Sequence, residues 1–159
     1  MKQNVAVIFG GVSSEHEVSL LSASYILRQL DEEKYNVIPL GITKEGRWFL
    51  YSGPVEALAD GSWEKDPGCK SAFLSPDRVT RGIIVMEKNG ARVLPVDVIV
   101  PVLHGKNGED GTMQGLFALT GIPYVGCDTL SSAICMDKAV AHSLLTNIGI
   151  EQTHYLWFF

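Results

Sequence analysis

Short apolar runs alternate with a segment of helical periodicity in the first part of the chain. The first apolar run covers residues 5–8, and the second, interrupted by Pro39, covers residues 35–42. Between the two runs, apolar residues recur at the spacing of one buried helix face: Leu20, Ala23, Leu27 and Leu30. This order predicts a β-α-β unit whose two strands are parallel and joined by a right-handed crossover.

The start of the predicted helix carries the pattern of a capping box. Ser14 and Glu17 stand three residues apart, a spacing at which each side chain can satisfy a free backbone amide of the first turn. We therefore expect the helix to run from Ser14 to about Leu30. In this arrangement Glu15 lies in the first turn, at the carboxyl edge of the sheet, and His16 is a solvated neighbour.

The middle of the chain favours strands over helices. The elements expected in its first half are a short strand, a helical turn and a polar loop: residues 48–51, 55–59 and 60–77. Residues 82–88 and 91–95 then flank Asn89-Gly90, a pair that tolerates the positive φ angles of a tight hairpin turn. We interpret this middle part as an elaboration at one edge of the sheet.

A second strand-helix pattern follows the hairpin. Residues 98–103 form the continuous apolar run that is typical of a buried parallel strand. Asp110 is placed to cap the next helix, which ends at Gly121 and leads into a short strand over residues 122–125. Past a boundary near Asp128, the pattern predicts two helices and a strand: residues 131–136, 138–147 and 153–159.

The pattern as a whole predicts an α/β protein. Residues 1–127 are expected to form a Rossmann-like parallel sheet with helices on both faces, and residues 128–159 to open a second domain. With 46% hydrophobic and 19% charged residues, the composition is that of a globular chain.

Charge and hydropathy exclude several classes of partner. The formal net charge of −5 argues against general binding to nucleic acid or to an anionic membrane. No apolar run approaches the ~18 residues of a membrane span, and the first residues lack a signal-peptide core. Three cysteines have neither zinc nor redox spacing: Cys69, Cys127 and Cys135. We expect a cytoplasmic protein.

Glycine-rich turns follow both of the strands that we expect to be buried and parallel. Gly10 and Gly11 follow the first strand, and His104 begins the second turn. Because ligands bind outside the carboxyl ends of strands in open α/β sheets, the two turns predict one edge of a binding cleft. The first turn has neither the spacing of the dinucleotide fingerprint nor that of a phosphate-binding P-loop, which disfavours both classes of nucleotide site there.

Three side chains are candidates for chemistry, each with a structural alternative. Glu15 at a helix start either binds a ligand or simply complements the helix dipole, an effect worth ~0.3–1 kcal/mol. His104 at a strand end either acts on a ligand or bonds a neighbouring backbone carbonyl. Lys138 opposes the dipole of its helix, which favours an anionic partner, although a solvated lysine is the common outcome.

Taken together, these segments resemble the D-alanine–D-alanine ligases, a family that includes the D-alanine–D-serine and D-alanine–D-lactate ligases of vancomycin resistance. Each motif is weak alone, but all of them occur in the family's order. They are Phe9-Gly10-Gly11, Glu15-His16-Glu17-Val18-Ser19, Leu103-His104-Gly105, Gly108-Glu109-Asp110-Gly111, Gln114-Gly115, Tyr124-Val125-Gly126, Ser131-Ser132-Ala133 and Met136-Asp137-Lys138.

The resemblance implies a reaction and roles for individual residues. The family uses ATP and Mg²⁺ to phosphorylate the carboxylate of a first D-alanine, and the amine of a second D-alanine then attacks the acyl phosphate. By resemblance, Glu15 holds the ammonium of the first D-alanine, His104 lies near its carboxylate and Lys138 contacts the ATP phosphates. The same pocket is lined by further residues: Gly10, Gly11 and Val18. Family members are commonly homodimers.

The resemblance also implies that this chain is one part of a longer ligase. Residues 1–127 correspond to the N-terminal substrate-binding domain and residues 128–159 to the beginning of the central ATP-grasp domain. The family's main nucleotide and metal ligands are expected beyond Phe159, so this chain alone is expected to be inactive. The alternatives are a D-alanine–D-serine or D-alanine–D-lactate ligase, another ATP-grasp ligase, and a non-catalytic module that binds a small metabolite or a partner.

Overall fold

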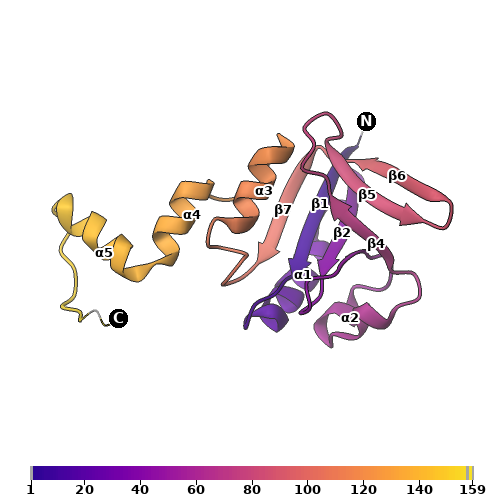
Figure 1. Ribbon diagram of the computed structural model, residues 1–159. Coiled ribbons are helices and arrows are strands. Elements are labelled where there is room, and N and C mark those ends of the chain that lie inside the picture. The colour runs from indigo at the N-terminus through magenta and orange to yellow at the C-terminus, as the bar shows by residue number, and fades with distance from the viewer. Residues whose placement is uncertain (1, 157, 159) are drawn as a thin grey trace.

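The computed structural model describes residues 2–156 and Phe158, and within them one seven-stranded mixed sheet carries helices on both faces (Figure 1). The strands are β1 (Gln3–Gly10), β2 (Tyr35–Ile42), β3 (Trp48–Leu50), β4 (Lys70–Leu74), β5 (Gly82–Glu87), β6 (Gly90–Pro95) and β7 (Val98–Leu103). The helices are α1 (His16–Gln29), α2 (Glu56–Ala59), the 3₁₀ turn η1 (Ser62–Lys65), α3 (Thr112–Thr120), α4 (Thr129–Met136) and α5 (Lys138–Asn147).

The sheet is parallel at one end and antiparallel at the other. Its order is β6-β5-β4-β3-β2-β1-β7, in which β2, β1 and β7 are parallel and all the other pairs are antiparallel. The prediction of an α/β fold with helices on both faces is confirmed, and the middle part of the chain, expected as an elaboration at one edge, supplies the antiparallel strands. Parallel neighbours need a long crossover, whereas the turns that join β2 to β3, β4 to β5 and β5 to β6 are short and suit antiparallel pairs.

A strand lies within the segment that we expected to be a polar loop. β4 occupies Lys70–Leu74, pairs with β3 and β5, and buries Ala72 and Leu74 while Phe73 stays half-exposed. Alternate residues of a strand face opposite sides of the sheet, so only every second side chain needs to be apolar. The turn η1 also lies in the segment expected to be a loop, whereas β3, α2 and the hairpin of β5 and β6 lie where the sequence predicts them.

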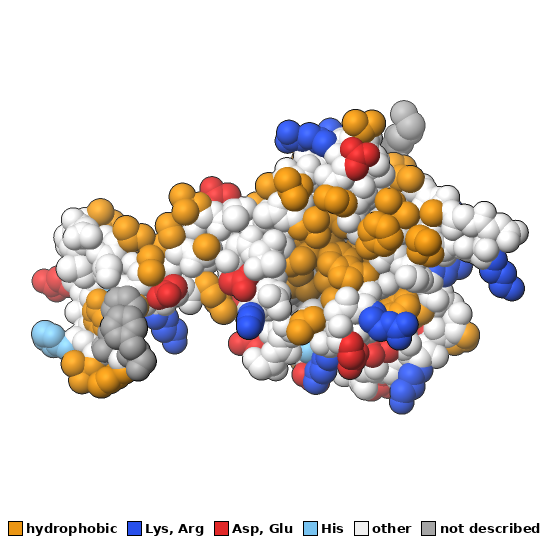
Figure 2. Space-filling view, viewed as in Figure 1, with side chains coloured by type: hydrophobic (Ala, Val, Ile, Leu, Met, Phe, Trp, Pro, Cys, Tyr) orange, Lys and Arg blue, Asp and Glu red, His pale blue; other side chains and the backbone are white. Residues whose placement is uncertain are grey.

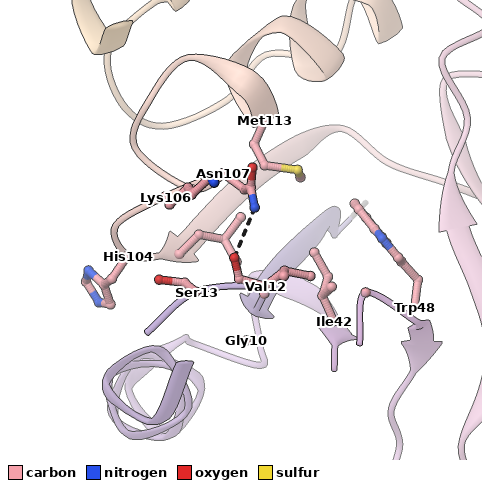
Figure 3. Close-up of a pocket in the computed structure, with 13 residues that line it drawn as sticks. Gly10, Val12, Ser13, Ile42, Trp48, His104, Lys106, Asn107 and Met113 are labelled. Atoms are coloured by element: carbon pink, nitrogen blue, oxygen red, sulfur yellow. Dashed lines mark hydrogen bonds between the residues drawn. The ribbon is translucent and has the colours of Figure 1, made fainter. Parts of the chain in front are cut away.

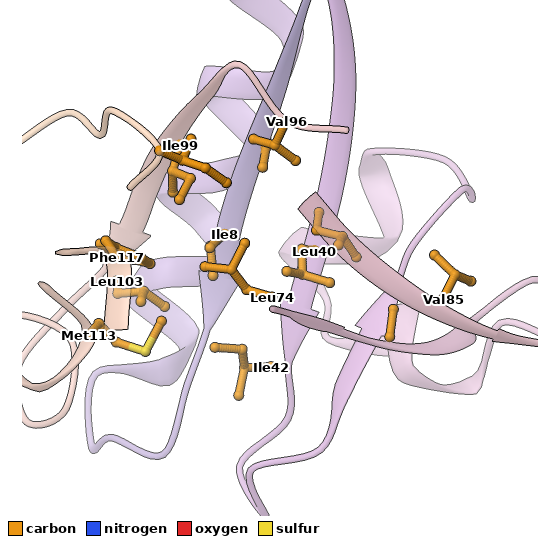
Figure 4. Close-up of a cluster of buried hydrophobic side chains, with 14 residues drawn as sticks. Ile8, Leu40, Ile42, Leu74, Val85, Val96, Ile99, Leu103, Met113 and Phe117 are labelled. Carbon is orange, nitrogen blue, oxygen red and sulfur yellow. The ribbon is translucent and has the colours of Figure 1, made fainter. Parts of the chain in front are cut away.

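The residues of β1 divide the core into two clusters, one on each face of the sheet. Ala6 and Ile8 point toward the face covered by α3, where Phe117 and Met113 join them (Figure 4). Phe9 and its alternating neighbours point toward the face covered by α1. The buried members of that second cluster are Val5, Val7, Phe9, Leu20, Ala23, Leu27, Tyr51, Leu58, Trp63 and Val102. The central strand is therefore apolar at successive positions, as the sequence pattern predicts.

The α3 side of the sheet is not completely covered. Figure 2 shows apolar side chains gathered between α3 and the β4–β5 part of the sheet. Partly buried apolar residues pack against the core cluster of this face: Ile38, Trp48, Leu50, Leu94, Leu116 and Tyr124.

The start of α1 differs from the predicted capping box. The helix begins at His16, Glu15 occupies the N-cap position, and no side chain bonds the free amides of the first turn. Glu17 instead pairs with Lys44 in the turn after β2, and this ammonium holds the pKa of the Glu17 carboxyl below its ordinary value. An ion pair with another element thus takes the place of the predicted capping hydrogen bonds.

His16 is buried, with 3% of its surface exposed, so the expectation of a solvated side chain is wrong. Its Nδ1 donates to the carbonyl oxygen of Gly11 at 2.8 Å. Gly10 and Gly11 have φ angles of 85° and 101°, and this left-handed backbone turns the Gly11 carbonyl back over the helix start.

The last part of the chain lies away from the sheet (Figure 1). The predicted helices α4 and α5 are confirmed, and no described residue of α5 is buried. The short strand at 122–125 is reduced to a single bridge between Tyr124 and Ile99. The strand expected at 153–159 is wrong for residues 153–156 and 158, which have no regular secondary structure, and Trp157 and Phe159 lie outside the described residues.

The division of the chain into two domains at residues 127 and 128 remains a prediction.

None of the helices in the described part of the chain is long and apolar enough to cross a membrane.

Gly10 is the glycine on which the turn after β1 depends. A Cβ atom at this position would overlap the Ile42 carbonyl, so Gly10→Ala adds a steric clash to the strain of a left-handed backbone. Gly61→Ala is the matched control, because Gly61 has a φ of 75° but nothing within 4 Å of its Cβ position. We expect Gly61→Ala to lower the free energy of unfolding by about 1–2 kcal/mol and Gly10→Ala by about 3 kcal/mol or more, measured by urea denaturation. Equal losses would show that the close approach to Ile42 is not the constraint.

Candidate functional site

The carboxyl ends of β1 and β7 lie side by side, with Gly10 opposite Leu103 in the parallel register. The hydroxyl of Ser19, buried in α1, joins the two ends because it accepts from the Gly10 amide at 2.7 Å and donates to the Val102 carbonyl. The Gly11 amide donates to the Ile42 carbonyl at 2.8 Å, which ties the same turn to β2. These backbone and Ser19 hydrogen bonds fix the edge of the sheet without any contribution from the side chains that face a ligand.

Glu15 lies against the backbone of Gly105, in the turn after β7. A Cβ atom on Gly105 would stand 3.1 Å from Glu15 Oε2 and 3.0 Å from Ser13 Oγ. The turn after β1 therefore approaches the turn after β7 at Gly105, where the absence of a side chain leaves room for Glu15 and Ser13. The Glu15 carboxylate remains exposed to solvent, as a group that binds a charged ligand must be.

His104 is held between a helix and its own turn. Its Nε2 lies 3.2 Å from Ser22 Oγ on α1, and its Nδ1 lies 4.0 Å from Glu109 Oε1. The imidazole is 31% exposed, so one part of the ring is open to solvent. The structural alternative for His104 was a hydrogen bond to a neighbouring backbone carbonyl. In the described structure the ring instead bonds the Ser22 hydroxyl.

Ser22 is a site residue that the sequence analysis missed. It stands seven residues after Glu15 and four after Val18, a spacing that places all three on one face of α1. Val18 is 52% exposed on that face. The signal for Ser22 is this spacing, but it has meaning only once His104 is known to lie opposite α1.

Acidic side chains shape the turn after β7. Asp110, which the sequence predicts as the cap of α3, lies one residue before the N-cap Gly111 and still bonds the first amide of the helix. Glu109 Oε2 accepts from the Gly105 amide at 2.7 Å, and Asp110 accepts from the amides of Asn107 at 2.8 Å and Thr112 at 3.0 Å. Burial by itself would raise the pKa of Asp110, but these amides together hold it below its ordinary value. Asp110 is therefore ionised at neutral pH and bonds to the start of α3.

A cavity of about 230 Å³ opens between the two turns. Its walls are mainly apolar and come from β2, β3, β7 and α3: Ile42, Trp48, Leu103 and Met113 (Figure 3). Gly10, Gly11, Ser13, His104, Lys106 and Asn107 bring backbone and polar groups to it. Glu15 and Val18 lie outside this lining, on the α1 side of the same edge.

Lys138 is not brought to this edge. It is the exposed first residue of α5 and is not among the residues that line the cavity. Asp137 caps the same helix by accepting from the amides of Ala139 at 2.9 Å and Val140 at 3.1 Å. The structure thus gathers five of the predicted site residues along one edge and leaves the sixth on a separate helix.

Similar proteins give an independent line of evidence. The D-alanine–D-alanine ligase of Caldicellulosiruptor bescii is 55% identical over 155 residues, which cover 98% of this chain and 42% of that relative. The crystal structure of the VanG D-Ala:D-Ser ligase from Enterococcus faecalis aligns with a TM-score of 0.87 at 47% identity, over 94% of this chain and 43% of that one. The D-alanine-D-alanine ligase from Coxiella burnetii aligns with a TM-score of 0.80 at 32% identity, over 93% of this chain and 42% of that one.

The chain thus spans less than half the length of these relatives. A family model described as the D-ala D-ala ligase N-terminus matches residues 4–127. This match confirms the resemblance that was drawn from the motifs of the two turns. The chain belongs to the D-alanine–D-alanine ligase N-terminal family.

Proposed function

We propose that this chain supplies the first-substrate site of an ATP-dependent ligase that joins two D-alanines into D-alanyl-D-alanine for peptidoglycan synthesis. One observation carries the proposal: Glu15 and His104 come from separate turns at one edge of the sheet, and the Glu15 carboxylate lies against Gly105, the residue that follows His104. An amino acid offers an ammonium and a carboxylate a few ångströms apart, and this edge offers a partner for each.

The chemistry requires activation of a carboxylate, which is a poor electrophile. The first D-alanine's carboxylate oxygen attacks the terminal phosphorus of ATP, and ADP leaves. The amine of the second D-alanine then attacks the carbonyl carbon of the acyl phosphate, loses a proton, and inorganic phosphate leaves. Such a reaction depends on positioning and on stabilisation of charge rather than on a covalent enzyme intermediate.

Glu15 would bind the ammonium of the first D-alanine through a charge-assisted hydrogen bond, which is worth about 1.5–3 kcal/mol. Val18, one turn further along α1, would contact the substrate from the same helix face. The Gly10-Gly11 turn would let the backbone approach the substrate closely. His104 would lie near the substrate carboxylate, with its ring oriented by Ser22 and Glu109.

The nucleotide part of the proposal rests on fewer groups of this chain. The exposed ammonium of Lys138 fits a contact with the ATP phosphates. Mg²⁺ would neutralise charge on those phosphates. In the part of the chain that the structure describes, no three His, Cys, Asp or Glu side chains are grouped to hold a metal ion, so we assign none of them to Mg²⁺.

The proposal extends to the organisation of the whole protein. Residues 1–127 would be the N-terminal substrate-binding domain, and residues 128–159 the beginning of an ATP-grasp domain. The intact protein would be a cytoplasmic homodimer. The match of the family model to residues 4–127 and the position of α4 and α5 away from the sheet support this division.

A D-alanine–D-serine ligase is the second candidate function. It is favoured by the similarity to the VanG D-Ala:D-Ser ligase at 47% identity. Both candidates use D-alanine as the first substrate, so the role proposed for Glu15 is the same in each. They differ only in the nucleophile of the second step.

The role of Glu15 is tested by Glu15→Gln in the intact ligase. The amide keeps the shape of the side chain but loses the charge, so we expect the KM for the first D-alanine to rise about 10- to 100-fold. Glu17→Gln is the matched control, because Glu17 is exposed on the same helix and pairs with Lys44. Steady-state kinetics with D-alanine as the varied substrate give both values. An unchanged KM in Glu15→Gln would rule out ammonium binding by this carboxylate.

The reaction itself is tested by phosphate release with ATP, Mg²⁺ and D-alanine, repeated with D-serine and D-lactate added. We expect the intact protein to release phosphate only when D-alanine is present, with the product identified by mass spectrometry. The 159-residue chain alone is expected to release none, because it spans 42% of its relative's length. Turnover by the 159-residue chain would contradict the division proposed above. D-alanine binding without turnover in the intact protein would favour a non-catalytic module.

A further inference from the structure

Asn107 has an unusual backbone conformation for its residue type. Its φ angle is 66°, and among the described residues the other non-glycine residue with a positive φ is Arg81, at 42°. Asparagine adopts the left-handed region more readily than most residues, but glycine would do so at lower cost. This turn already contains glycine, at Gly108, so a glycine could also have formed the backbone at position 107. The presence of a side chain there is therefore explained by the contacts that the side chain makes.

The side chain of Asn107 joins the turn after β7 to the turn after β1. Its Nδ2 donates to the Val12 carbonyl oxygen at 3.0 Å, as the dashed line in Figure 3 shows. Its backbone amide donates to Asp110 Oδ2 at 2.8 Å, which fixes the residue within its own turn. Asn107 is therefore anchored at one end and reaches across the cavity mouth with the other.

The Asn107–Val12 hydrogen bond connects the turn that carries Glu15 to the turn that carries His104. Val12 is three residues before Glu15, and Asn107 is three residues after His104. In the part of the chain that the structure describes, it is the hydrogen bond that links the two turns directly, since the contact between Gly105 and Glu15 is one of packing. Asn107 thus ties the Glu15 turn to the His104 turn directly, in addition to the bonds that Ser19 and Ser22 make from α1.

We propose that Asn107 is a positioning residue, which holds the Glu15 turn at the correct distance from the His104 turn for the first substrate. This inference rests on the proposed function, in which Glu15 binds the substrate ammonium. The residue type follows from two requirements: tolerance of a left-handed backbone and an N–H donor at the end of a short side chain. Glycine meets only the first requirement, and aspartate lacks the donor.

Two variants of the intact ligase separate the hydrogen bond from the backbone conformation. Asn107→Gly relieves the backbone and removes the bond. Asn107→Asp keeps the size of the side chain but sets a carboxylate against the Val12 carbonyl. We expect the KM for the first D-alanine to rise about 3- to 10-fold in Asn107→Gly and further in Asn107→Asp, with kcat changed less than about 2-fold, because a neutral hydrogen bond of this kind has that worth.

Arg81→Gly is the matched control, because it relieves the other positive φ angle at an exposed position in the turn before β5. We expect it to leave both KM and kcat unchanged. A rise in KM for Arg81→Gly equal to that for Asn107→Gly would overturn the proposal, since it would assign the effect to general loosening of the chain. Should Asn107→Gly not fold, Asn107→Asp gives the same comparison.

A double variant distinguishes failure of this inference from failure of the proposed function. If Asn107 acts by placing Glu15, then adding Asn107→Gly to Glu15→Gln should raise KM no further. Additive effects would overturn the positioning role. A raised KM in Glu15→Gln with an unchanged KM in Asn107→Gly would also overturn it while leaving the proposed function intact. Unchanged KM values in both single variants would contradict the proposed function itself.

Discussion

Parallel pairing of β1 with β7 brings the ends of two buried strands to the same edge of the sheet, and the candidate site depends on that pairing. β1 buries side chains on both faces, with Ile8 in one core cluster and Phe9 in the other. A slip of one residue would exchange the two faces along the whole strand. Burying each large side chain contributes about 1.5–3 kcal/mol, so the register of Gly10 against Leu103 is strongly fixed.

Polar groups at the same edge of the sheet fix how α1 and the first turn are oriented on the apolar core. Ser19 is fully buried and bonds the ends of both strands from α1, so the helix, the first turn and β7 form one unit. Glu15 then leaves that unit at the helix N-cap, where its carboxylate is exposed. A buried carboxylate without a partner would destabilise the fold before a ligand arrived, whereas an exposed one stays hydrated until an ammonium replaces its water.

The sequence could predict those features that are local or that involve continuous apolar runs. β2, the β5–β6 hairpin and α5 lie where the pattern places them, since each carries a complete signal in its own residues. β4 could not be found in this way, because one of its faces is exposed and it lies among polar residues.

The site residues divide in the same manner. Glu15 and His104 follow predicted strands, so their shared edge could be foreseen. The pairing of Glu17 with Lys44 and the bond of Ser22 to His104 join separate elements, and no spacing within one element encodes such contacts. The capping-box prediction is wrong for this reason. Lys44, in the turn after β2, pairs with the Glu17 carboxylate that the local pattern assigns to the helix start.

The two halves of the proposed site differ in what holds them. The first-substrate groups lie on α1 and on turns that follow buried strands, whereas Lys138 lies on α5, which has no buried residue in the described structure. Exposed apolar residues recur every four positions along that helix and its C-cap: Val140, Leu144 and Ile148. Such a stripe is typical of a helix that packs against another element. In the proposed ligase, contact between Lys138 and ATP would therefore depend on packing along this stripe, and binding of the D-alanine ammonium by Glu15 would not.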